Sequence, residues 1–435
     1  MDIDQSLKIA ADTEFIEVRG RVSQVIGMVV ESLGPGISVG SICEISTFRG
    51  REAVPAEVVG FRQGKVLLMP LGEMRGVEPG SVIRQVGGQA QVPVSEAMLG
   101  RVIDGLGRPI DGKGPLPATS CYPLYAEPLN PMTRERVKEP VDVGVRVLNG
   151  LLTLGKGQRI GIMAGSGVGK STLLGMIARH TAADISVIAL IGERGRELKD
   201  FIERDLGPEG LARSVVVVAT SDQPPLVRMR GAYLATSISE YFRDQGRDVV
   251  MMMDSVTRFA MSSREVGLAI GEPPTSRGYT PSVFSQLPKL LERAGTCEGK
   301  GSITGLYTVL VEGDDMNEPI ADAVRSIVDG HVVLSRDLAA QGHYPAIDIL
   351  ASISRCMPDV MDRDYMIKAR KFLEIMAVYR KSEDLINIGA YARGSNPKID
   401  EAINMIDDLN GYLCQQVDET ASLADSADAL AALVA

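Results

Sequence analysis

The sequence is poor in the residues that mark several common classes of protein. Its 435 residues include no tryptophan, and aromatic residues make up 4% of the chain, so few side chains are available to stack on nucleic-acid bases. The net charge of −10 also argues against nucleic acid as the main partner. The chain has no apolar run long enough to span a membrane and no basic-then-apolar segment at its start. We therefore expect neither a membrane span nor a signal peptide.

Cysteine and histidine are scarce and show no spacing typical of a metal site. The cysteines are scattered without a C-x-x-C pair, which favours reduced thiols in a cytoplasmic protein over a disulfide framework. The three histidines likewise have no metal-ligand spacing. We therefore expect neither disulfide bonds nor a metal bound by these side chains. The residues are Cys43, Cys121, Cys297, Cys356, Cys414, His180, His331 and His343.

The most informative stretch is a glycine-rich loop at residues 164–172. The apolar residues 160–163 before it have the composition of a buried strand, and residues 173–178 after it have a helical pattern. This order is typical of a phosphate-binding loop, whose backbone N–H groups and helix N-terminus hold phosphate oxygens. The first glycine of the usual pattern is replaced by Ala164. The predicted ATP-binding residues of the loop are Gly165, Ser166, Gly167, Val168, Gly169, Lys170, Ser171 and Thr172.

Ser171 and Asp254 predict a Mg²⁺ site beside this loop. The ammonium group of Lys170 is expected to reach the β- and γ-phosphates, while the Ser171 hydroxyl coordinates Mg²⁺. Asp254 directly follows the apolar residues 249–253, at the end of a predicted strand. A carboxylate in that position holds Mg²⁺ in phosphate-loop ATPases, often through water. We therefore expect Mg²⁺ to accompany the nucleotide.

A carboxylate that polarises the attacking water is expected at the end of the strand that follows the loop. ATP hydrolysis needs such a group because the protein otherwise contributes mainly electrostatic stabilisation. Residues 192–197, which follow the apolar residues 185–191, contain Glu193 and Glu197. Residue chemistry alone does not choose between these two glutamates. A solvated run of charges at a strand end has a similar composition.

The N-terminal part of the chain has the pattern of a small all-β domain. Short alternating apolar runs, at 20–30, 41–45 and 65–69, are separated by glycine and proline turns. This indicates a β-barrel, for which we favour a structural or oligomerisation role because stacking aromatics are few. Tight-turn residues at 99–112 and a proline-rich connection at 115–131 then mark a domain boundary.

Downstream of the glycine-rich loop, the pattern predicts an α/β domain followed by helices. Near-continuous apolar runs fit a mainly parallel sheet covered on both faces, and the apolar spacing becomes helical from residue 363. The expected fold is a RecA-like nucleotide domain between an N-terminal β-barrel and a C-terminal helical domain. The apolar runs are residues 185–191, 214–219, 249–253, 303–310 and 331–334. The predicted parts are an N-terminal segment 1–14, a β-barrel 15–92, an ATPase domain 93–362 and a helical domain 363–435.

Six stretches carry a resemblance to a known family: residues 164–172, 192–197, 268–275, 312–322, 345–355 and 388–394. The stretches 164–172, 192–197 and 345–355 resemble the hexameric rotary ATPases, which include the catalytic and non-catalytic subunits of rotary ATP synthases. Within that family, the stretches 268–275, 312–322 and 388–394 make the sequence most similar to the flagellum-specific export ATPases of the type III protein-export branch, in which Ala164 is usual. The resemblance extends from about Arg19 to the C-terminus.

The resemblance implies a homohexamer with ATP and Mg²⁺ at each subunit interface. Glu193 would polarise the attacking water, and Arg194 would support the phosphates, beside the catalytic Lys170. Tyr344 would stack on adenine, with Tyr391 as a further contact on the far side. Arg355 would act in trans as an arginine finger on the γ-phosphate held by the next subunit, which makes hydrolysis depend on assembly.

The resemblance also implies partners at an export apparatus. ATP turnover would release chaperones, unfold flagellar substrates and deliver them to an export gate, with the enzyme in the cytoplasm and docked at the inner face of the cytoplasmic membrane. Regulator and stalk proteins of the apparatus would bind the ring. The acidic residues after Lys398 form either a solvated face or a contact for the stalk or for chaperone-bound substrates. They are Asp400, Glu401, Asp407, Asp408, Asp418, Glu419, Asp425 and Asp428.

Three other functions share parts of this pattern. An ATPase of a virulence injectisome has nearly all the same motifs, and loss of motility on deletion would distinguish the flagellar enzyme. A subunit of a proton-driven ATP synthase would need a second type of subunit to form its ring. A hexameric RNA translocase would be stimulated by RNA, but the acidic balance and the few aromatics disfavour it, so no nucleic-acid partner is expected.

Overall fold

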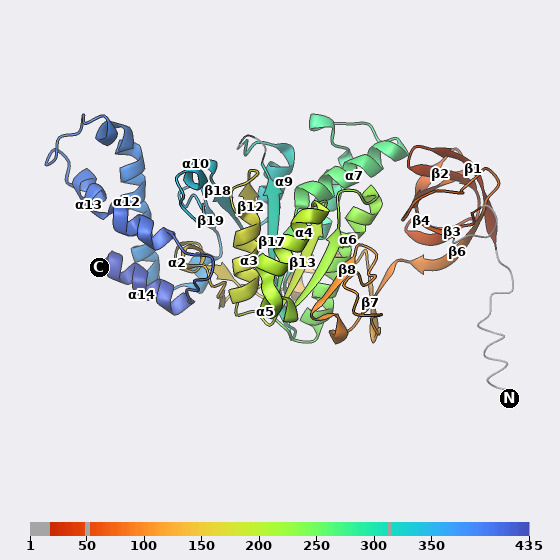
Figure 1. Cartoon of the computed structure of the whole chain (residues 1–435), viewed down its shortest axis with the longest axis horizontal. Helices are drawn as coiled ribbons and strands as arrows, with labels where there is room; N and C mark the ends of the chain where they lie inside the picture. The colour runs from red at the N-terminus through yellow and green to blue at the C-terminus, as the bar shows by residue number, and fades with distance from the viewer. Residues whose placement is uncertain (1–17, 48–52, 312, 314, 435) are drawn as a thin grey trace.

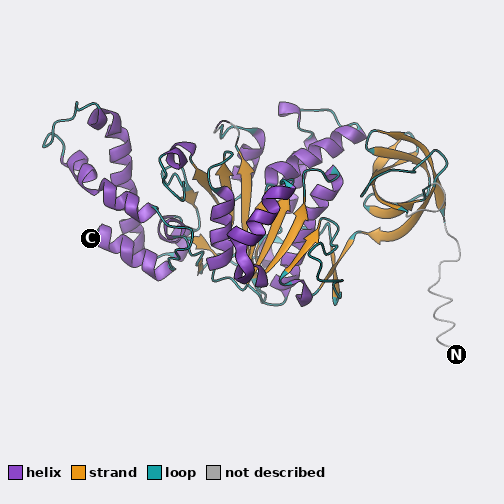
Figure 2. Ribbon diagram, in the orientation of Figure 1, coloured by secondary structure: helices purple, strands orange, loops and turns teal. Residues whose placement is uncertain are grey.

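The computed structural model describes residues 18–47, 53–311, 313 and 315–434. The predicted segment 1–14 lies outside the described residues, as do Glu312 and Asp314 of the stretch 312–322. The described residues form three parts in chain order along the longest axis: a β-barrel, a central α/β domain and a group of helices (Figure 1). Figure 2 shows the strands of the central part lying between helices. The predicted fold class is therefore confirmed.

The N-terminal part is a closed antiparallel barrel whose described strands follow the order β1-β2-β5-β4-β3-β6. Alternate apolar side chains, such as Val22, Val58 and Leu68, are buried inside it. Residues 20–30, one run in the sequence pattern, divide at Gly27, whose φ of +56° suits a tight turn. The strands are β1 (Arg19–Ile26), β2 (Val29–Leu33), β3 (Ser41–Ile45), β4 (Val54–Arg62), β5 (Lys65–Pro70) and β6 (Val82–Gln89).

The central domain is built on a mainly parallel sheet, as predicted. Its described strands follow the order β19-β18-β12-β17-β15-β13-β14-β8, with β16 paired to β17. Neighbours from β18 to β8 are parallel, whereas β19 and β16 are antiparallel additions. The strands are β8 (Arg101–Asp104), β12 (Arg159–Ala164), β13 (Ile185–Ile191), β14 (Ser214–Ala219), β15 (Val249–Asp254), β16 (Gly295–Thr296), β17 (Ser302–Leu310), β18 (Gly330–Leu334) and β19 (Ile353–Ser354).

Alternate residues of the buried strands belong to two different cores. On β15, Met251 and Met253 lie in the core that α6 and α7 cover, whereas Val250 and Met252 lie in the core that α3 covers. Burial on both faces explains why these strands read as continuous apolar runs. The helices of this domain are α2 (Arg146–Leu151), α3 (Lys170–His180), α4 (Gly195–Asp200), the π-helix η4 (Phe201–Leu206), α5 (Gly207–Ala212), α6 (Pro225–Asp244), α7 (Val256–Ile270), α8 (Pro281–Leu291), α9 (Pro319–Ile327), α10 (Arg336–Ala340) and α11 (Met357–Val360).

The sequence pattern missed three strands of this sheet: the two-residue antiparallel additions β16 and β19, and the parallel edge strand β8. Within residues 99–112, where turns are expected, the segment Arg101–Asp104 forms β8 and pairs in parallel with β14 at the edge of the sheet. A turn does follow, in which Asp104 Oδ1 accepts hydrogen bonds from the N–H groups of Leu106 and Arg108. A four-residue strand next to turn residues carries little local signal, because pairing with β14 determines it.

Short elements connect the barrel to the sheet and complete the domain edges. Strands β7 and β9 pair as an antiparallel ribbon, and β10 and β11 form a second one. The strands are β7 (Gln91–Val94), β9 (Ser120–Pro123), β10 (Pro140–Val141) and β11 (Leu154–Gly155), and the 3₁₀ turns are η2 (Glu96–Met98), η3 (Pro131–Thr133) and η5 (Ser276–Gly278).

The C-terminal part is helical, as the apolar spacing predicts. It consists of α12 (Arg363–Asn387), α13 (Pro397–Leu413) and α14 (Leu423–Leu433) in the described residues. Phe372 and Tyr412 pack between α12 and α13 with ring centroids 5.5 Å apart, and the Tyr365 hydroxyl donates to the Gly150 carbonyl of α2 at 2.8 Å. In the part of the chain that the structure describes, no helix is long and apolar enough to cross a membrane.

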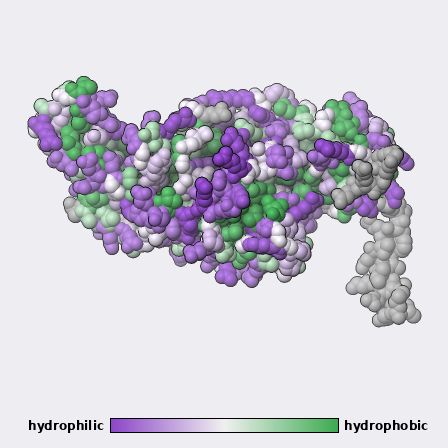
Figure 3. Space-filling view, in the orientation of Figure 1, coloured by the Kyte–Doolittle hydropathy of each residue, from purple (hydrophilic) through white to green (hydrophobic). Residues whose placement is uncertain are grey.

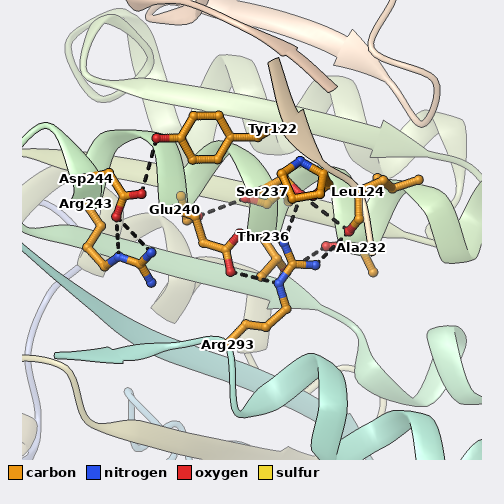
Figure 4. A network of polar contacts seen from close by, with 12 residues as sticks. Tyr122, Leu124, Ala232, Thr236, Ser237, Glu240, Arg243, Asp244 and Arg293 are labelled. Carbon is orange, nitrogen blue, oxygen red and sulfur yellow. Dashed lines mark hydrogen bonds and ion pairs between the residues drawn. The ribbon is translucent and has the colours of Figure 1, made fainter. Parts of the chain in front are cut away.

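A buried ion pair holds the segment that connects the barrel to the sheet against the central domain (Figure 4). Arg293, which follows α8, is fully buried, and its guanidinium donates to the two carboxylate oxygens of Glu240 on α6 at 2.8 and 2.6 Å. It also donates to the Leu124 carbonyl at 2.8 Å and to the Ser237 hydroxyl at 2.9 Å. Because Leu124 follows β9, this network joins α6, the end of α8 and the connecting segment.

Replacing Arg293 by methionine is expected to lower the free energy of unfolding by about 3 kcal/mol, because Glu240 would keep a buried charge without its cation. Urea unfolding followed by circular dichroism measures this loss. The matched control is Lys398→Met, which removes an exposed pair with Glu374 and should lower the free energy of unfolding far less than Arg293→Met does. Equal losses for the two variants would contradict a stabilising contribution of the buried network.

Candidate active site

The glycine-rich loop lies between β12 and α3 and lines a cavity of about 610 Å³. Helix α3 begins at Lys170, and the residue before it, Gly169, has a φ of +87°, where a side chain would be strained. The loop therefore brings the positive N-terminal end of α3 to the cavity, where it favours an anion. Val168 differs from its neighbours because its side chain is buried in the core. The loop residues that line the cavity are Ala164, Gly165, Ser166, Gly167, Gly169, Lys170, Ser171 and Thr172.

Three charged side chains meet beside this cavity, which two of them, Lys170 and Glu193, line. Lys170 Nζ contacts Asp254 Oδ1 and lies 3.8 Å from Glu193 Oε1. Lys170 begins α3, Asp254 ends β15, and Glu193 follows β13. Their meeting follows from the parallel sheet, because the carboxyl ends of its strands lie along the same edge.

The structure distinguishes the two glutamates that residue chemistry left open. The side chain of Glu193 is 19% exposed and lies beside Lys170, whereas that of Glu197 is 53% exposed and accepts a hydrogen bond from Arg194 at 3.1 Å. Burial raises the pKa of Glu193, and the nearby Asp254 carboxylate raises it further, while Lys170 and Arg258 act in the opposite direction. Glu193 is therefore the carboxylate that is held at the inner part of the cavity.

The donor set at this site fits Mg²⁺. The described residues contain no cluster of three or more His, Cys, Asp or Glu side chains that could hold a metal on its own. Mg²⁺ in ATPases does not need one, because it keeps several waters and uses one or two protein oxygens together with the substrate phosphates. Ser171 lines the cavity, and Asp254 is buried next to Lys170. These two oxygen donors are thus placed where a nucleotide-bound Mg²⁺ could use them.

The remaining predicted residues differ in their distance from the loop. Arg194 lines the cavity, but its side chain is 81% exposed and pairs with Glu197. Figure 3 shows that the surface over α4 is strongly hydrophilic. Tyr344 is half-exposed and lies against the loop, since a Cβ built on Gly169 would stand 3.5 Å from its ring. A nucleotide base leaving the loop could therefore reach the Tyr344 ring.

Tyr391 lies elsewhere, in the connection between α12 and α13. Its hydroxyl donates to the Asn396 carbonyl at 2.9 Å and to Asp400 Oδ1 at 3.1 Å. This connection is at the end of the molecule away from α3 (Figure 1). Within one chain, the structure does not bring Tyr391 to the glycine-rich loop.

Arg355 is also separated from the cavity of its own chain. It follows β19, the outermost strand of the sheet, and its side chain is exposed. Its backbone N–H donates to the Asp329 carbonyl at 3.0 Å, which anchors the backbone beneath the exposed guanidinium. Arg355 is therefore not among the residues that line the cavity of its own chain.

Sequence reasoning missed two cationic residues that line the cavity, Arg258 and Arg336. Arg258 lies in the first turn of α7, four residues after Asp254, and its Nε atom is buried without a hydrogen-bond partner among the described residues. Gly192 makes room for it, because a Cβ there would stand 2.8 Å from Arg258 Cβ. The available signal was its place just after Asp254, since the first turn of a helix that follows a strand lies near the end of that strand.

Comparison with protein families gives three matches along the chain. Residues 22–87 match the beta-barrel domain of the ATP synthase alpha/beta family, and residues 144–354 match the nucleotide-binding domain of the same family. Residues 361–432 match the T3SS EscN ATPase C-terminal domain. The three matches follow the order of the barrel, the central domain and the C-terminal helices.

Individual relatives match almost the whole chain. The flagellum-specific ATP synthase of Bacillus subtilis is 55% identical over 95% of this chain and 94% of its own length. The type 3 secretion system ATPase of Xanthomonas euvesicatoria is 48% identical over 94% of this chain and 93% of its own length.

Two solved structures show the same fold over nearly the full length. The assembled ATPase EscN from the type III secretion system of enteropathogenic E. coli superposes with a TM-score of 0.91, at 45% identity over 96% of this chain and all of that chain. EscN in complex with its central stalk EscO gives a TM-score of 0.88 at 44% identity, again over 96% of this chain and all of that chain.

Proposed function

Because the chain belongs to the ATP synthase alpha/beta family and is an ATPase of its type III export branch, we propose that it hydrolyses Mg²⁺-bound ATP to drive the export of flagellar proteins. The observation that carries this proposal is the meeting of Lys170, Asp254 and Glu193 beside the glycine-rich loop. A phosphate-binding cation, a carboxylate for the metal and a carboxylate for the water are what phosphoryl transfer to water requires.

Each residue in or beside the cavity has a role that its position supports. Lys170 and the N-terminus of α3 hold the phosphates, while Ser171 and Asp254 hold Mg²⁺, which neutralises charge on the phosphate oxygens when it is bound. Glu193 orients and polarises the attacking water because it lies next to Lys170 and is shielded from solvent. The buried, unpaired Nε of Arg258 makes this residue a further phosphate contact, with Arg194 at the outer rim.

The geometry of Arg355 supports a homohexamer with ATP at each interface. An exposed arginine just after the edge strand β19 can act on the γ-phosphate of a neighbour but not on that of its own chain. Tyr344 stacks on adenine at the mouth of the cavity, as its contact with the loop supports. Tyr391 becomes an adenine contact only if assembly or closure of the C-terminal helices brings it closer.

The high sequence identity to one flagellar relative supports a flagellar system over an injectisome. The Bacillus subtilis flagellar relative is 55% identical, compared with 48% for the Xanthomonas euvesicatoria type 3 secretion relative. We propose that the ring works in the cytoplasm at the export apparatus, where it binds regulator and stalk proteins, export chaperones and their substrates near the gate. The EscN–EscO complex supports a stalk partner of this kind. Loss of motility on deletion would support the flagellar system, whereas loss of injectisome secretion alone would contradict it.

Glu193→Gln is expected to lower kcat about 100-fold while ATP still binds, because the amide keeps the shape of the side chain but cannot polarise water. The matched control is Glu197→Gln, which should remain within about threefold of the unmodified enzyme because Glu197 pairs with Arg194 at the exposed rim. Phosphate release at saturating Mg²⁺–ATP measures kcat, and secretion of flagellar protein into the medium should fall in parallel. A greater loss in the Glu197 variant would transfer the role to that residue.

The proposed role of Glu193 also predicts how kcat depends on pH. Glu193 acts as a carboxylate, and burial and Asp254 raise its pKa. Activity should therefore be complete above this raised pKa and fall as the pH decreases through it, at a higher pH than an exposed glutamate would give. The pH profile of kcat for Glu197→Gln should keep this acid limb, whereas the residual activity of Glu193→Gln should lack it.

A further inference from the structure

A threonine hydroxyl lies inside the sheet at the point where the predicted metal ligand is held. Strand β17 runs between β12, which leads into the glycine-rich loop, and β15, which ends at Asp254. Thr308 pairs with Ile162 of β12 on one side, and on the other side its neighbour Tyr307 pairs with Met253. This register puts Thr308 beside Asp254, at the edge of the sheet that faces the nucleotide cavity.

The Thr308 hydroxyl is directed at the Asp254 carboxylate. Its Oγ1 donates to Asp254 Oδ1 at 2.7 Å and lies 3.3 Å from the Met253 carbonyl, and the residue is fully buried. A buried hydroxyl is unfavourable unless it is hydrogen-bonded, and valine would fill the same place in a parallel strand without that requirement. The hydroxyl therefore serves to hydrogen-bond Asp254, since an apolar side chain of the same size would fill the core equally well.

We propose that Thr308 is a positioning residue that holds the Asp254 carboxylate in its metal-binding orientation throughout the ATPase cycle; this inference rests on the proposed Mg²⁺ role of Asp254. Lys170 contacts the same oxygen, Oδ1, as Thr308 does. In the described part of the chain, the hydrogen bonds to the Asp254 side chain all fall on Oδ1, which leaves Oδ2 for a metal or its water.

The two partners of Asp254 differ in their freedom to move. Lys170 has a long side chain, and its ammonium group must move toward the phosphates when ATP is bound, which removes it from Asp254. The Thr308 hydroxyl sits on a short β-branched side chain in the middle of a paired strand, so it stays in place. Thr308 is thus the partner that keeps Asp254 oriented when Lys170 is engaged with the nucleotide.

The test compares Thr308→Val and Thr308→Ser by measuring phosphate release over a Mg²⁺ titration at fixed ATP. Thr308→Val should raise the Mg²⁺ concentration for half-maximal rate about tenfold and lower kcat by a similar factor, because a hydrogen bond to a charged group is lost. Thr308→Ser should restore both values to within about threefold, because the hydroxyl is kept. The binding of a fluorescent ATP analogue without Mg²⁺ should stay within about twofold for both variants.

Thr304→Val is the matched control on the same strand. Thr304 is also buried on β17, but its hydroxyl accepts from the Gly157 N–H at 2.9 Å, away from the cavity. This variant should leave the Mg²⁺ dependence unchanged even if it lowers the melting temperature. Unchanged Mg²⁺ dependence and kcat in Thr308→Val, or no rescue by serine, would overturn the proposal. Asp254→Asn tests the metal role of Asp254 separately from the positioning role of Thr308. A normal Mg²⁺ dependence in that variant would show that Asp254 does not bind the metal.

Discussion

Lys170→Ala is expected to reduce ATP hydrolysis by at least about 1,000-fold, because it removes the cation that stabilises the phosphates as charge develops in the transition state. The side chain is 12% exposed, so its charge acts where solvent screening is weak. Its loss also leaves the carboxylates of Asp254 and Glu193 without the ammonium group that lies between them. The variant should therefore bind the phosphates less tightly. The Mg²⁺–ATP that does bind should also be poorly oriented for hydrolysis.

The fold of this variant should be intact, because Lys170 begins α3 and contributes little to either core. Circular dichroism and thermal unfolding check the fold, and phosphate release with a coupled assay checks the rate. Lys199→Ala is the matched control, since Lys199 is an exposed lysine of α4 that pairs with Glu203. Turnover in Lys170→Ala comparable with that in Lys199→Ala would remove the phosphate-loop assignment.

Local pattern was sufficient for those parts of the site that are continuous in sequence. The glycine-rich loop and the beginning of α3 follow from one stretch, and Asp254 follows from the apolar run that it ends. The parallel sheet follows from runs that are apolar on both faces, because each face packs against a different layer of helices. These features depend on residues that are close together in the chain, so they can be predicted from the sequence.

Features that depend on packing between distant segments were not predictable in the same way. Glu193 and Glu197 have the same chemistry, and they differ because Glu193 lies beside Lys170 while Glu197 is directed at Arg194. The side chain of Arg258 enters the cavity because Gly192, on another segment, leaves space for it. Strand β8 exists because β14 offers it a partner. Each of these depends on a contact that local composition does not encode.

Arg355→Ala is expected to reduce ATP hydrolysis by at least about 1,000-fold, although the residue is absent from the cavity of its own chain. Its exposed guanidinium on the far edge of the sheet would complete the site of a neighbour by neutralising charge on the γ-phosphate. The loss should appear mainly in kcat, because the binding loop and Tyr344 of each chain remain intact. The rate of the unmodified enzyme should rise faster than linearly with protein concentration in the range where rings assemble.

Mixing Arg355→Ala chains with Lys170→Ala chains distinguishes action in trans from action in cis. A ring contact is heterologous, so each interface pairs the cavity of one chain with the arginine of the next. In a random equal mixture, an intact cavity meets an intact arginine at about one quarter of the interfaces, and activity should recover toward that fraction if the sites act independently. An arginine acting in cis predicts no recovery, because each chain then lacks part of its own site.

The control for this mixture replaces the Lys170→Ala chain with a chain that carries both substitutions. The mixture with Arg355→Ala then still contains intact cavities but no intact arginine, so activity should stay at the level of the separate variants. Mixed rings can be verified by differently tagged chains that are purified in sequence. Absence of recovery in verified mixed rings of the first kind would contradict an arginine finger at Arg355, and with it the requirement for a neighbour. Recovery in the first mixture and not in the second would place the catalytic unit at the contact between two chains.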